Sequence, residues 1–471
     1  MKTATQWLAV VYFLIGWANG WLPATAAETV PVGIARVDIT PDHPVRLVGY
    51  ASRQTESEGV AQRIWAKALA IGSNEGDGPA VLIMVENCGV PAAMTAQVAG
   101  RLEAQAGLKR ERVVLCSTHI HTGPWLAGLL TLHTAGEIPA EHFERMKRYT
   151  ERLTGLIVQV AEQALAARKP AVLSWTQGSV GFAMNRRPVK DGRCPGLGVN
   201  PQGAVDHSLP LLRVTDPQGK LLAVVLNYAC HGTTLGDKQN KVHGDWAGCA
   251  QEFIEAEHSG TTAIVCLGCG ADANPEPRNK WEFAPQHGRA MADEVNRLLA
   301  GTFKPITPKL TVRYRQIQLP YDTLPTREEF QSRVAKGEHP KASGWDKRMA
   351  THARAMLALL DRGALPTTID YPVTTWTFGD DLGMVFLPGE VVVDFALRLK
   401  KELDGSRLWV TAYANDVPCY IVSRRILQEG GYEPDTSIIG YGRPTRLAPT
   451  VEDLVIETVE SLLPASLARK R

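Results

Sequence analysis

The chain has 471 residues, of which 44% are hydrophobic and 21% are charged. This composition is typical of a globular protein with a large core, and it excludes a disordered or membrane-embedded chain. The chain has 51 basic and 49 acidic residues, so its formal net charge is only +2. No strong electrostatic field recruits nucleic acid or anionic lipid, so we expect no nucleic-acid partner.

The N-terminus has the pattern of a secretory signal peptide. A lysine at position 2 precedes an apolar run over 7–17, and small residues follow around 24–27. The apolar run is too short to cross a bilayer as a mature helix, so we expect no stable membrane insertion. We predict a signal peptide over 1–27, export to the periplasm or the extracellular space, and a mature domain over 28–471. An uncleaved anchor is the alternative.

Polar residues repeatedly follow short apolar, β-branched runs. Five runs predict strands that end in such residues: 112–117, 221–228, 261–267, 383–387 and 408–413. Side chains from several strands converge at the carboxyl ends of an open α/β sheet. We therefore predict an α/β fold, a single large domain with a mixed β-sheet flanked by helices, and an active site at the C-terminal ends of the strands.

Helical periodicity marks the segments between these runs. The apolar stripe over 151–168 predicts an amphipathic helix closed by Pro170,. Thr450 and Asp453 predict a capping box before a helix over 450–463,. The charged stretch 321–366 interrupts the strand rhythm, and it is either a helical insertion or lid, or a solvated pair of surface helices,.

The eight cysteines are scattered along the chain. A chain of this size does not need disulfides to hold its core, so most of them are expected to be buried thiols. Cys266 and Cys269 have the spacing of a redox or zinc pair, but no second pair exists and they end an apolar run. We therefore expect Cys266 and Cys269 to be core packing residues and not a redox or zinc pair. Whether any disulfide forms is left open.

His119-Ile120-His121 is the sharpest local signal for chemistry. On an extended segment, residues i and i+2 point to the same side, so both imidazoles are expected to face one cavity. His231 also ends a predicted strand, and Glu390 follows Pro388-Gly389 just before a helix expected near Val391. Imidazoles and a carboxylate suit a catalytic zinc ion with one position open to water. An ordinary first-turn glutamate is the alternative for Glu390.

A series of motifs resembles the neutral/alkaline, non-lysosomal ceramidases, and it covers nearly the whole chain in the order seen in that family. The motifs are Val37-Asp38-Ile39-Thr40-Pro41, Gly49-Tyr50, Ser117-Thr118-His119-Ile120-His121-Thr122-Gly123-Pro124, Met184-Asn185-Arg186, Cys230-His231-Gly232-Thr233, Gly244-Asp245-Trp246-Ala247-Gly248, Leu387-Pro388-Gly389-Glu390 and Tyr420-Ile421-Val422-Ser423.

The resemblance implies a single catalytic Zn²⁺ ion and the residues that hold it. The metal ligands carried over by motif are His119, His231, Glu390 and Tyr420. In the family a second tyrosine follows the ligand tyrosine by twelve positions, and Tyr432 stands at that distance from Tyr420.

The resemblance also implies catalytic roles beside the metal. His121 falls where the family keeps a metal-proximal histidine, suited to take a proton from zinc-bound water and pass it to the leaving amine. Arg186 and Tyr432 are expected to stabilise the oxyanion.

Two departures from the family pattern bear on the substrate. The family has Gly-Asp-X-Ser-Pro where this chain has Gly270-Ala271-Asp272-Ala273-Asn274-Pro275, so Asn274 or Ala273 replaces a serine of the ceramide site. Asn274 can exchange hydrogen bonds but cannot act as a hydroxyl nucleophile. Only about 80 residues follow Glu390, so we expect the family's C-terminal β-sandwich to be missing, which makes engagement of ceramide in a bilayer less secure,.

The resulting expectation is a zinc-dependent amidohydrolase that cleaves the N-acyl amide bond of a ceramide or another lipid-like or small N-acylated amine. A zinc esterase or deacetylase acting on a carbohydrate or peptide-like compound is the rival enzyme, because the same metal chemistry serves both. An exported metal-binding protein is the rival outside enzymes. The sequence leaves open the acyl-chain preference, the oligomeric state and the metal that is bound.

Overall fold

The computed structural model describes residues 28–132 and 138–468. The predicted signal peptide over 1–27 lies outside the described residues. None of the described helices combines the length and the apolar character that crossing a lipid bilayer requires.

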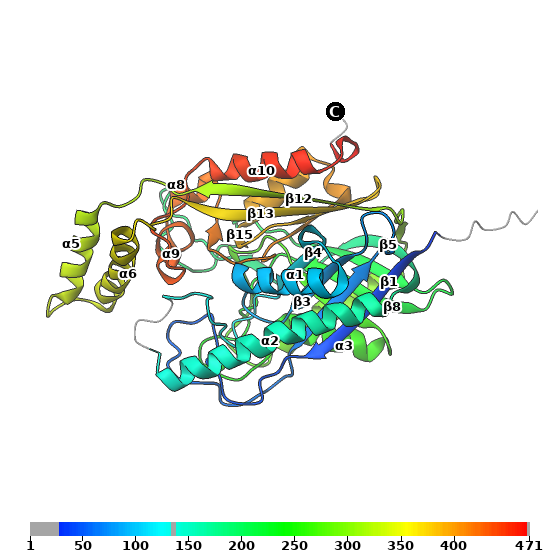
Figure 1. The fold of residues 1–471 in the computed structure, drawn as a ribbon, viewed down its shortest axis with the longest axis horizontal. Coiled ribbons are helices and arrows are strands. Elements are labelled where there is room, and N and C mark those ends of the chain that lie inside the picture. Colours follow the sequence, from blue (N-terminus) through cyan, green and yellow to red (C-terminus); the bar gives the residue numbers. More distant parts are fainter. Residues whose placement is uncertain (1–27, 133–137, 469–471) are drawn as a thin grey trace, which may run out of the picture.

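A mixed central sheet forms the middle of the fold (Figure 1). Its order is β4-β3-β2-β1-β5-β7-β8-β9, with β11 paired to β5. Only the β3/β4 and β8/β9 pairs are parallel. The strands are β1 (Val30–Asp38), β2 (Trp65–Ile71), β3 (Ala80–Val85), β4 (Val113–Ser117), β5 (Lys169–Ser179), β7 (Ser208–Thr215), β8 (Leu221–Tyr228), β9 (Thr262–Leu267) and β11 (Lys304–Pro305).

A second, smaller sheet packs on one face of the central sheet. Its order is β12-β13-β14-β16, and its strands are β12 (Leu310–Pro320), β13 (Thr368–Phe378), β14 (Leu382–Phe386) and β16 (Leu408–Thr411). Large side chains from both sheets form the layer between them, among them Trp175, Trp376, Phe386 and Trp409, all essentially without solvent contact. Two short ladders lie near the site: β6 (Ala183–Asn185) with β10 (Ala273–Pro275), and β15 (Glu390–Val391) with β17 (Tyr420–Ile421).

Helices cover the outer faces of this pair of sheets. The long helix α2 (Ala140–Ala166) crosses the central sheet and α10 (Val451–Leu462) covers the smaller sheet (Figure 1). Leu153, Ile157 and Ala161 of α2 are completely buried. The remaining helices are α1 (Ala92–Ala106), α3 (Asp245–Glu257), α4 (Phe283–Leu299), α5 (Arg327–Glu338), α6 (Gly344–Asp361), α7 (Val393–Glu402), α8 (Arg424–Glu429) and α9 (Ser437–Gly440).

The predicted fold class is confirmed: one domain holds mixed sheets with helices on their faces. All five predicted strands exist, with bounds that differ by at most two residues at either end. The helix expected over 151–168 begins earlier, because its apolar stripe continues back through Met146 and Tyr149. All eight cysteines are free and buried, as expected for packing residues.

One cap was predicted wrongly. Thr450 is the residue before α10, but its side chain makes no capping hydrogen bond. Asp453 instead accepts hydrogen bonds from Arg398 and Arg424 of neighbouring segments. The Asp453 carboxylate therefore forms tertiary ion pairs and does not cap the helix.

Candidate metal centre

The ends of β4 and β8 bring two of the predicted histidines together. Each parallel strand continues into a loop, and the two loops meet in a parallel bridge between Ile120 and Gly232. His119 and His231 flank this bridge, and their ring centroids are 4.7 Å apart. The expectation that polar residues converge at the carboxyl ends of the strands is confirmed for this pair.

The sequence pattern predicts extended backbone at His119, but His119 is not extended in the structure. Its φ of +47° places it in the left-handed region, which is uncommon for residues other than glycine,. The kink turns the chain but leaves both rings facing one space, since Nε2 of His121 lies 3.3 Å from Nε2 of His119. Backbone conformations of this kind are found at functional sites, where the surrounding structure holds them.

Glu390 reaches the same space from the short ladder β15/β17. Gly389 has a φ of +83°, which a side chain would resist, and it turns the chain out of β14,. Glu390 then pairs directly with Tyr420 in a parallel register. The helix expected near Val391 begins two residues later, at Val393. Glu390 is therefore a strand residue, and the first-turn interpretation is wrong.

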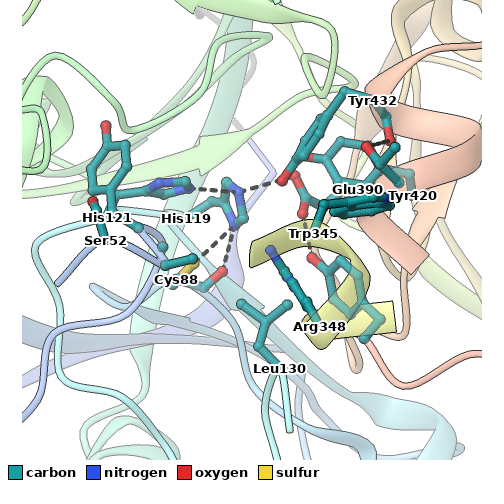
Figure 2. Close-up of a pocket in the computed structure, with 16 residues that line it drawn as sticks. Ser52, Cys88, His119, His121, Leu130, Trp345, Arg348, Glu390, Tyr420 and Tyr432 are labelled. Carbon is teal, nitrogen blue, oxygen red and sulfur yellow. Dashed lines mark hydrogen bonds and ion pairs between the residues drawn. The ribbon is translucent and has the colours of Figure 1, made fainter. Parts of the chain in front are cut away.

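The side chains of His119 and Glu390 face one another (Figure 2). One carboxylate oxygen of Glu390, Oε2, lies 3.1 Å from Nε2 of His119 and 3.0 Å from Nε2 of His231. One ligand atom from each of the three residues lies within 4.8 Å of the other two, and all three side chains are buried.

The opposite ring nitrogens fix the tautomers. Nδ1 of His119 lies 2.5 Å from the carbonyl oxygen of Cys88, and Nδ1 of His231 lies 3.0 Å from that of Gly270. A carbonyl only accepts, so each Nδ1 must donate, and Nε2 is the ring nitrogen of each histidine that faces Glu390. A backbone carbonyl behind each imidazole is the usual partner of a metal-ligating histidine. The residues present therefore fit a divalent cation such as zinc.

Tyr420 completes the predicted set from the side of Glu390. Its ring is buried and lines the same cavity as His119 and Glu390 (Figure 2). Its hydroxyl accepts a hydrogen bond of 3.0 Å from Nη2 of Arg186.

The charges of the cluster are strongly coupled. Burial raises the pKa of Glu390, but His119 and His231 outweigh it and hold that pKa well below its usual range. Burial lowers the pKa of His119, but Cys88 and Glu390 raise it to about 10. Burial and Arg186 lower the pKa of His231 to about 4. In the chain alone, the negative charge of Glu390 is thus balanced by a proton on His119, which a bound cation would displace.

His121 has the opposite environment. Burial, together with the neighbouring His119 and His231, holds its pKa well below the usual value. Its Nδ1 is buried and has no hydrogen-bond partner among the described residues. His121 is therefore a neutral imidazole beside the cluster, lining the cavity.

Arg186 belongs to a buried network behind the cluster. Its Nε donates to Glu433 at 2.9 Å, and its Nη1 lies 3.3 Å from Nε2 of His231. Arg187 makes a second ion pair with the same carboxylate of Glu433. Arg186 thus contacts two of the predicted ligands, His231 and Tyr420, from beneath the cavity wall.

Tyr432 and Asn274 occupy different places. Tyr432 lines the cavity and opens a single π-helical turn (Tyr432–Thr436), an irregularity often found at functional sites,. Burial raises its pKa to about 12, so its hydroxyl keeps its proton. Asn274 is buried in β10, where it accepts hydrogen bonds from Thr233 at 3.2 Å and Arg186 at 3.4 Å. It does not line the cavity.

The cavity in front of the cluster has a volume of about 390 Å³. Sequence reasoning missed several residues that shape it. The hydroxyl of Tyr441 donates to Glu390 Oε1, and the ring of Tyr413 stacks on His119 with centroids 4.3 Å apart. Trp345 and Arg348 of α6 also line the cavity. These residues form no local motif in the sequence.

Comparison with known proteins shows the family of the chain. Residues 31–284, which include His119 and His231, match the family model described as neutral/alkaline non-lysosomal ceramidase, N-terminal. The neutral ceramidase of Pseudomonas aeruginosa is 23% identical over 314 residues, which are 63% of this chain and 46% of that protein. That of Drosophila melanogaster is 25% identical over 262 residues, 52% of this chain and 35% of that protein. The matches thus span less than half the length of these curated relatives.

The fold agrees as well. The crystal structure of the neutral ceramidase from Pseudomonas aeruginosa superposes with a TM-score of 0.68 at 18% identity, over 92% of this chain and 74% of that one. Since the family model covers more than half of the chain, the resemblance read from the sequence motifs is confirmed. The chain belongs to the neutral/alkaline non-lysosomal ceramidase family.

Proposed function

We propose that the chain is a zinc-dependent amidohydrolase that cleaves an N-acyl amide bond, in a ceramide or another N-acylated amine. The observation that carries this proposal is the convergence of Nε2 of His119, Nε2 of His231 and Oε2 of Glu390, each buried and each free to face one cation. Tyr420 is the proposed fourth ligand. Zinc bound there would acidify a water molecule and polarise the amide carbonyl.

Structural zinc sites are typically closed by cysteine and histidine. The proposed set here is histidine, glutamate and tyrosine, and it borders an open cavity. This argues for a catalytic site over a binding protein with a structural metal.

The proposed acid and base is His121. Its imidazole is neutral, because burial and the neighbouring histidines lower its pKa. Nε2 is the atom directed at the cluster, so it can take a proton from water and return it to the leaving amine,. A neutral imidazole is required for the first of these two transfers.

Tyr432 is the proposed oxyanion donor, and Arg186 is proposed to stabilise the oxyanion indirectly. Tyr432 lines the cavity and keeps its hydroxyl proton, so it can donate to a developing negative charge,. Arg186 lies behind Tyr420 and is already paired with Glu433, so it acts on the oxyanion through the orientation and charge of its neighbours. Asn274 orients Arg186 and Thr233 and has no proposed contact with the substrate.

The test measures metal content and hydrolysis together. Purified native protein, His119→Ala and His339→Ala would be examined by elemental analysis and with a panel of N-acyl amides and matched O-acyl esters, with and without chelator. His339 is an exposed histidine at the end of α5 and serves as the control.

We expect about one zinc per native chain and loss of zinc in His119→Ala. In that variant kcat/KM should fall at least about 100-fold, which corresponds to roughly 2.7 kcal/mol. Retained zinc with full activity in His119→Ala refutes the mechanism. Hydrolysis of esters alone assigns the site to an esterase instead.

We also propose that residues 1–27 direct export. Pulse-labelled cells should contain a precursor that is shortened upon secretion, and an unshortened secreted or cytoplasmic chain contradicts this.

A further inference from the structure

The segment 321–366, for which the sequence left open an insertion or a pair of surface helices, contains a helical hairpin that borders the cavity in front of His119 and Glu390. Both helices begin with a capping box, at Thr326 and Ser343, so each helix end is defined by its own sequence,. α5 and α6 share a small core of their own around Phe330, Ala353 and Met356. Figure 1 shows the hairpin standing out from the two sheets at one end of the molecule.

The first turns of α6 present two side chains to the cavity. Trp345 and Arg348 are three positions apart and therefore lie on one face of the helix,. Both line the cavity together with His119, Glu390 and Tyr432. Figure 2 shows the Arg348 side chain pointing into the cavity from this helix, beside Leu130. The orientation is held from behind, where Nε2 of His352 contacts the carbonyl oxygen of Arg443 at 2.7 Å.

Arg348 has no anionic partner in the part of the chain that the structure describes. Its Nε is buried and makes no hydrogen bond there. Burial lowers the pKa of its guanidinium, an effect that the nearby Tyr432 only partly offsets. By contrast, Arg186 beneath the cavity is paired with Glu433. A half-buried guanidinium without a counter-ion is costly unless a ligand supplies the charge.

We propose that Arg348 selects substrates whose N-acyl amine carries an anionic group, a carboxylate in the simplest case. The guanidinium presents a planar fork of N–H donors that matches a carboxylate or phosphate in two parallel hydrogen bonds. A neutral amide substrate offers only hydroxyl and carbonyl oxygens and would leave the charge of Arg348 unpaired. The proposal rests on the proposed amide hydrolysis, which it narrows to a substrate class.

The cavity supports such a substrate in a second way. The aromatic wall of Trp345, which is 44% exposed, stands next to Arg348 and offers apolar surface to an acyl chain or a side chain. Arg348 and the metal ligands line the same cavity of about 390 Å³, so one small molecule can contact both. This volume suits a compact ligand.

The test compares three compounds: N-hexanoylglycine, its neutral carboxamide, and N-hexanoyl-phosphoethanolamine. The variants are Arg348→Met, which keeps the aliphatic stem, Arg348→Lys, which keeps the charge, and Lys347→Met, which removes an exposed charge from the same helix. Two readouts are used: kcat/KM with zinc-loaded protein, and calorimetric binding to metal-free protein, where no bound cation can attract the anion.

We expect native protein and Lys347→Met to bind and cleave N-hexanoylglycine at least about tenfold better than its carboxamide, since charged hydrogen bonds contribute this much or more. In Arg348→Met the ratio of kcat/KM for N-hexanoylglycine to kcat/KM for its carboxamide should fall close to one, mainly through a change in KM. Arg348→Lys should restore part of this ratio. Tighter binding of the phosphate compound supports the same anion site and identifies phosphate as its ligand.

Equal binding of the acid and its carboxamide by native protein overturns the proposal, as does an unchanged ratio in Arg348→Met. If no amide or ester is hydrolysed, the proposed hydrolase activity fails, whereas the binding measurement on metal-free protein still decides the role of Arg348.

Discussion

Glu390 and Tyr420 are direct register partners in the two-residue parallel ladder β15/β17. The backbone N–H of Glu390 also donates to the carbonyl oxygen of Cys419 at 3.0 Å. Two predicted ligands from separate segments of the chain are therefore fixed side by side by backbone hydrogen bonds. Ligands positioned in this way need little reorganisation when a cation binds.

Tyr441→Phe should weaken metal binding. The Tyr441 hydroxyl donates to Glu390 Oε1 and so orients the carboxylate whose other oxygen faces the two histidines. Removal of such an outer partner typically costs 10–100-fold in metal affinity, so we expect about that increase in the zinc Kd. Competition with a chromogenic chelator measures it.

Tyr314→Phe is the matched control, because the hydroxyl of Tyr314 donates to the exposed Gln316. Equal zinc affinity in native protein and Tyr441→Phe would show that Glu390 needs no such support.

Gly49→Ala should impair turnover while leaving the metal in place. A Cβ at Gly49 would lie 2.4 Å from Cγ of His121, so the imidazole must move. If His121 transfers the proton, its displacement should lower kcat about 10–100-fold. Elemental analysis should find the native zinc content, since the three atoms nearest to such a Cβ all belong to His121 and none to a proposed ligand.

Gly59→Ala is the control that distinguishes steric overlap with His121 from backbone strain as the cause of the effect of Gly49→Ala. Gly59 has a φ of +110°, close to the +100° of Gly49, but a Cβ there meets no atom within 4 Å. Both variants should lose stability in thermal unfolding because of the strained backbone, and only Gly49→Ala should lose kcat. A similar loss of kcat in both would remove the argument for His121.

Glu86→Gln should change how stability depends on pH. Burial raises the pKa of Glu86 from 4.5 to about 7, although Lys67 partly opposes this. A carboxyl with a raised folded-state pKa stabilises the fold fully below its unfolded pKa, and this contribution is lost as pH rises through the folded pKa. The native protein should therefore lose stability between about pH 5 and pH 8 relative to the variant, by up to about 3 kcal/mol.

Urea unfolding of both proteins at several pH values measures this difference. The exposed Glu58→Gln serves as control. A difference between native protein and Glu86→Gln that stays constant with pH would mean that Glu86 does not titrate in this window. The hydrogen bond from Trp65 N–H to Glu86 can form with either side chain.

The sequence by itself determined the strands, their polar ends and the family. β-Branched runs and helical periodicity are local signals, so β4, β8 and β9 could be predicted from short windows,. The motifs around His119, His231 and Glu390 are equally local. They named the residues whose donor atoms the structure brings together.

Other features depend on contacts between distant segments, and only the tertiary structure decided them. Glu390 pairs with Tyr420 in a strand, which rules out the alternative of a helical first turn. Asp453 pairs with Arg398 and Arg424 and does not form its expected cap. Tyr441 and Arg348 reach the site through the tertiary fold, and the sequence around each of them contains no motif that predicts this position. Local sequence fixes which elements form, because backbone propensity and periodicity act over a few residues. The packing of whole elements decides which side chains share a cavity, because that contact is made across the fold.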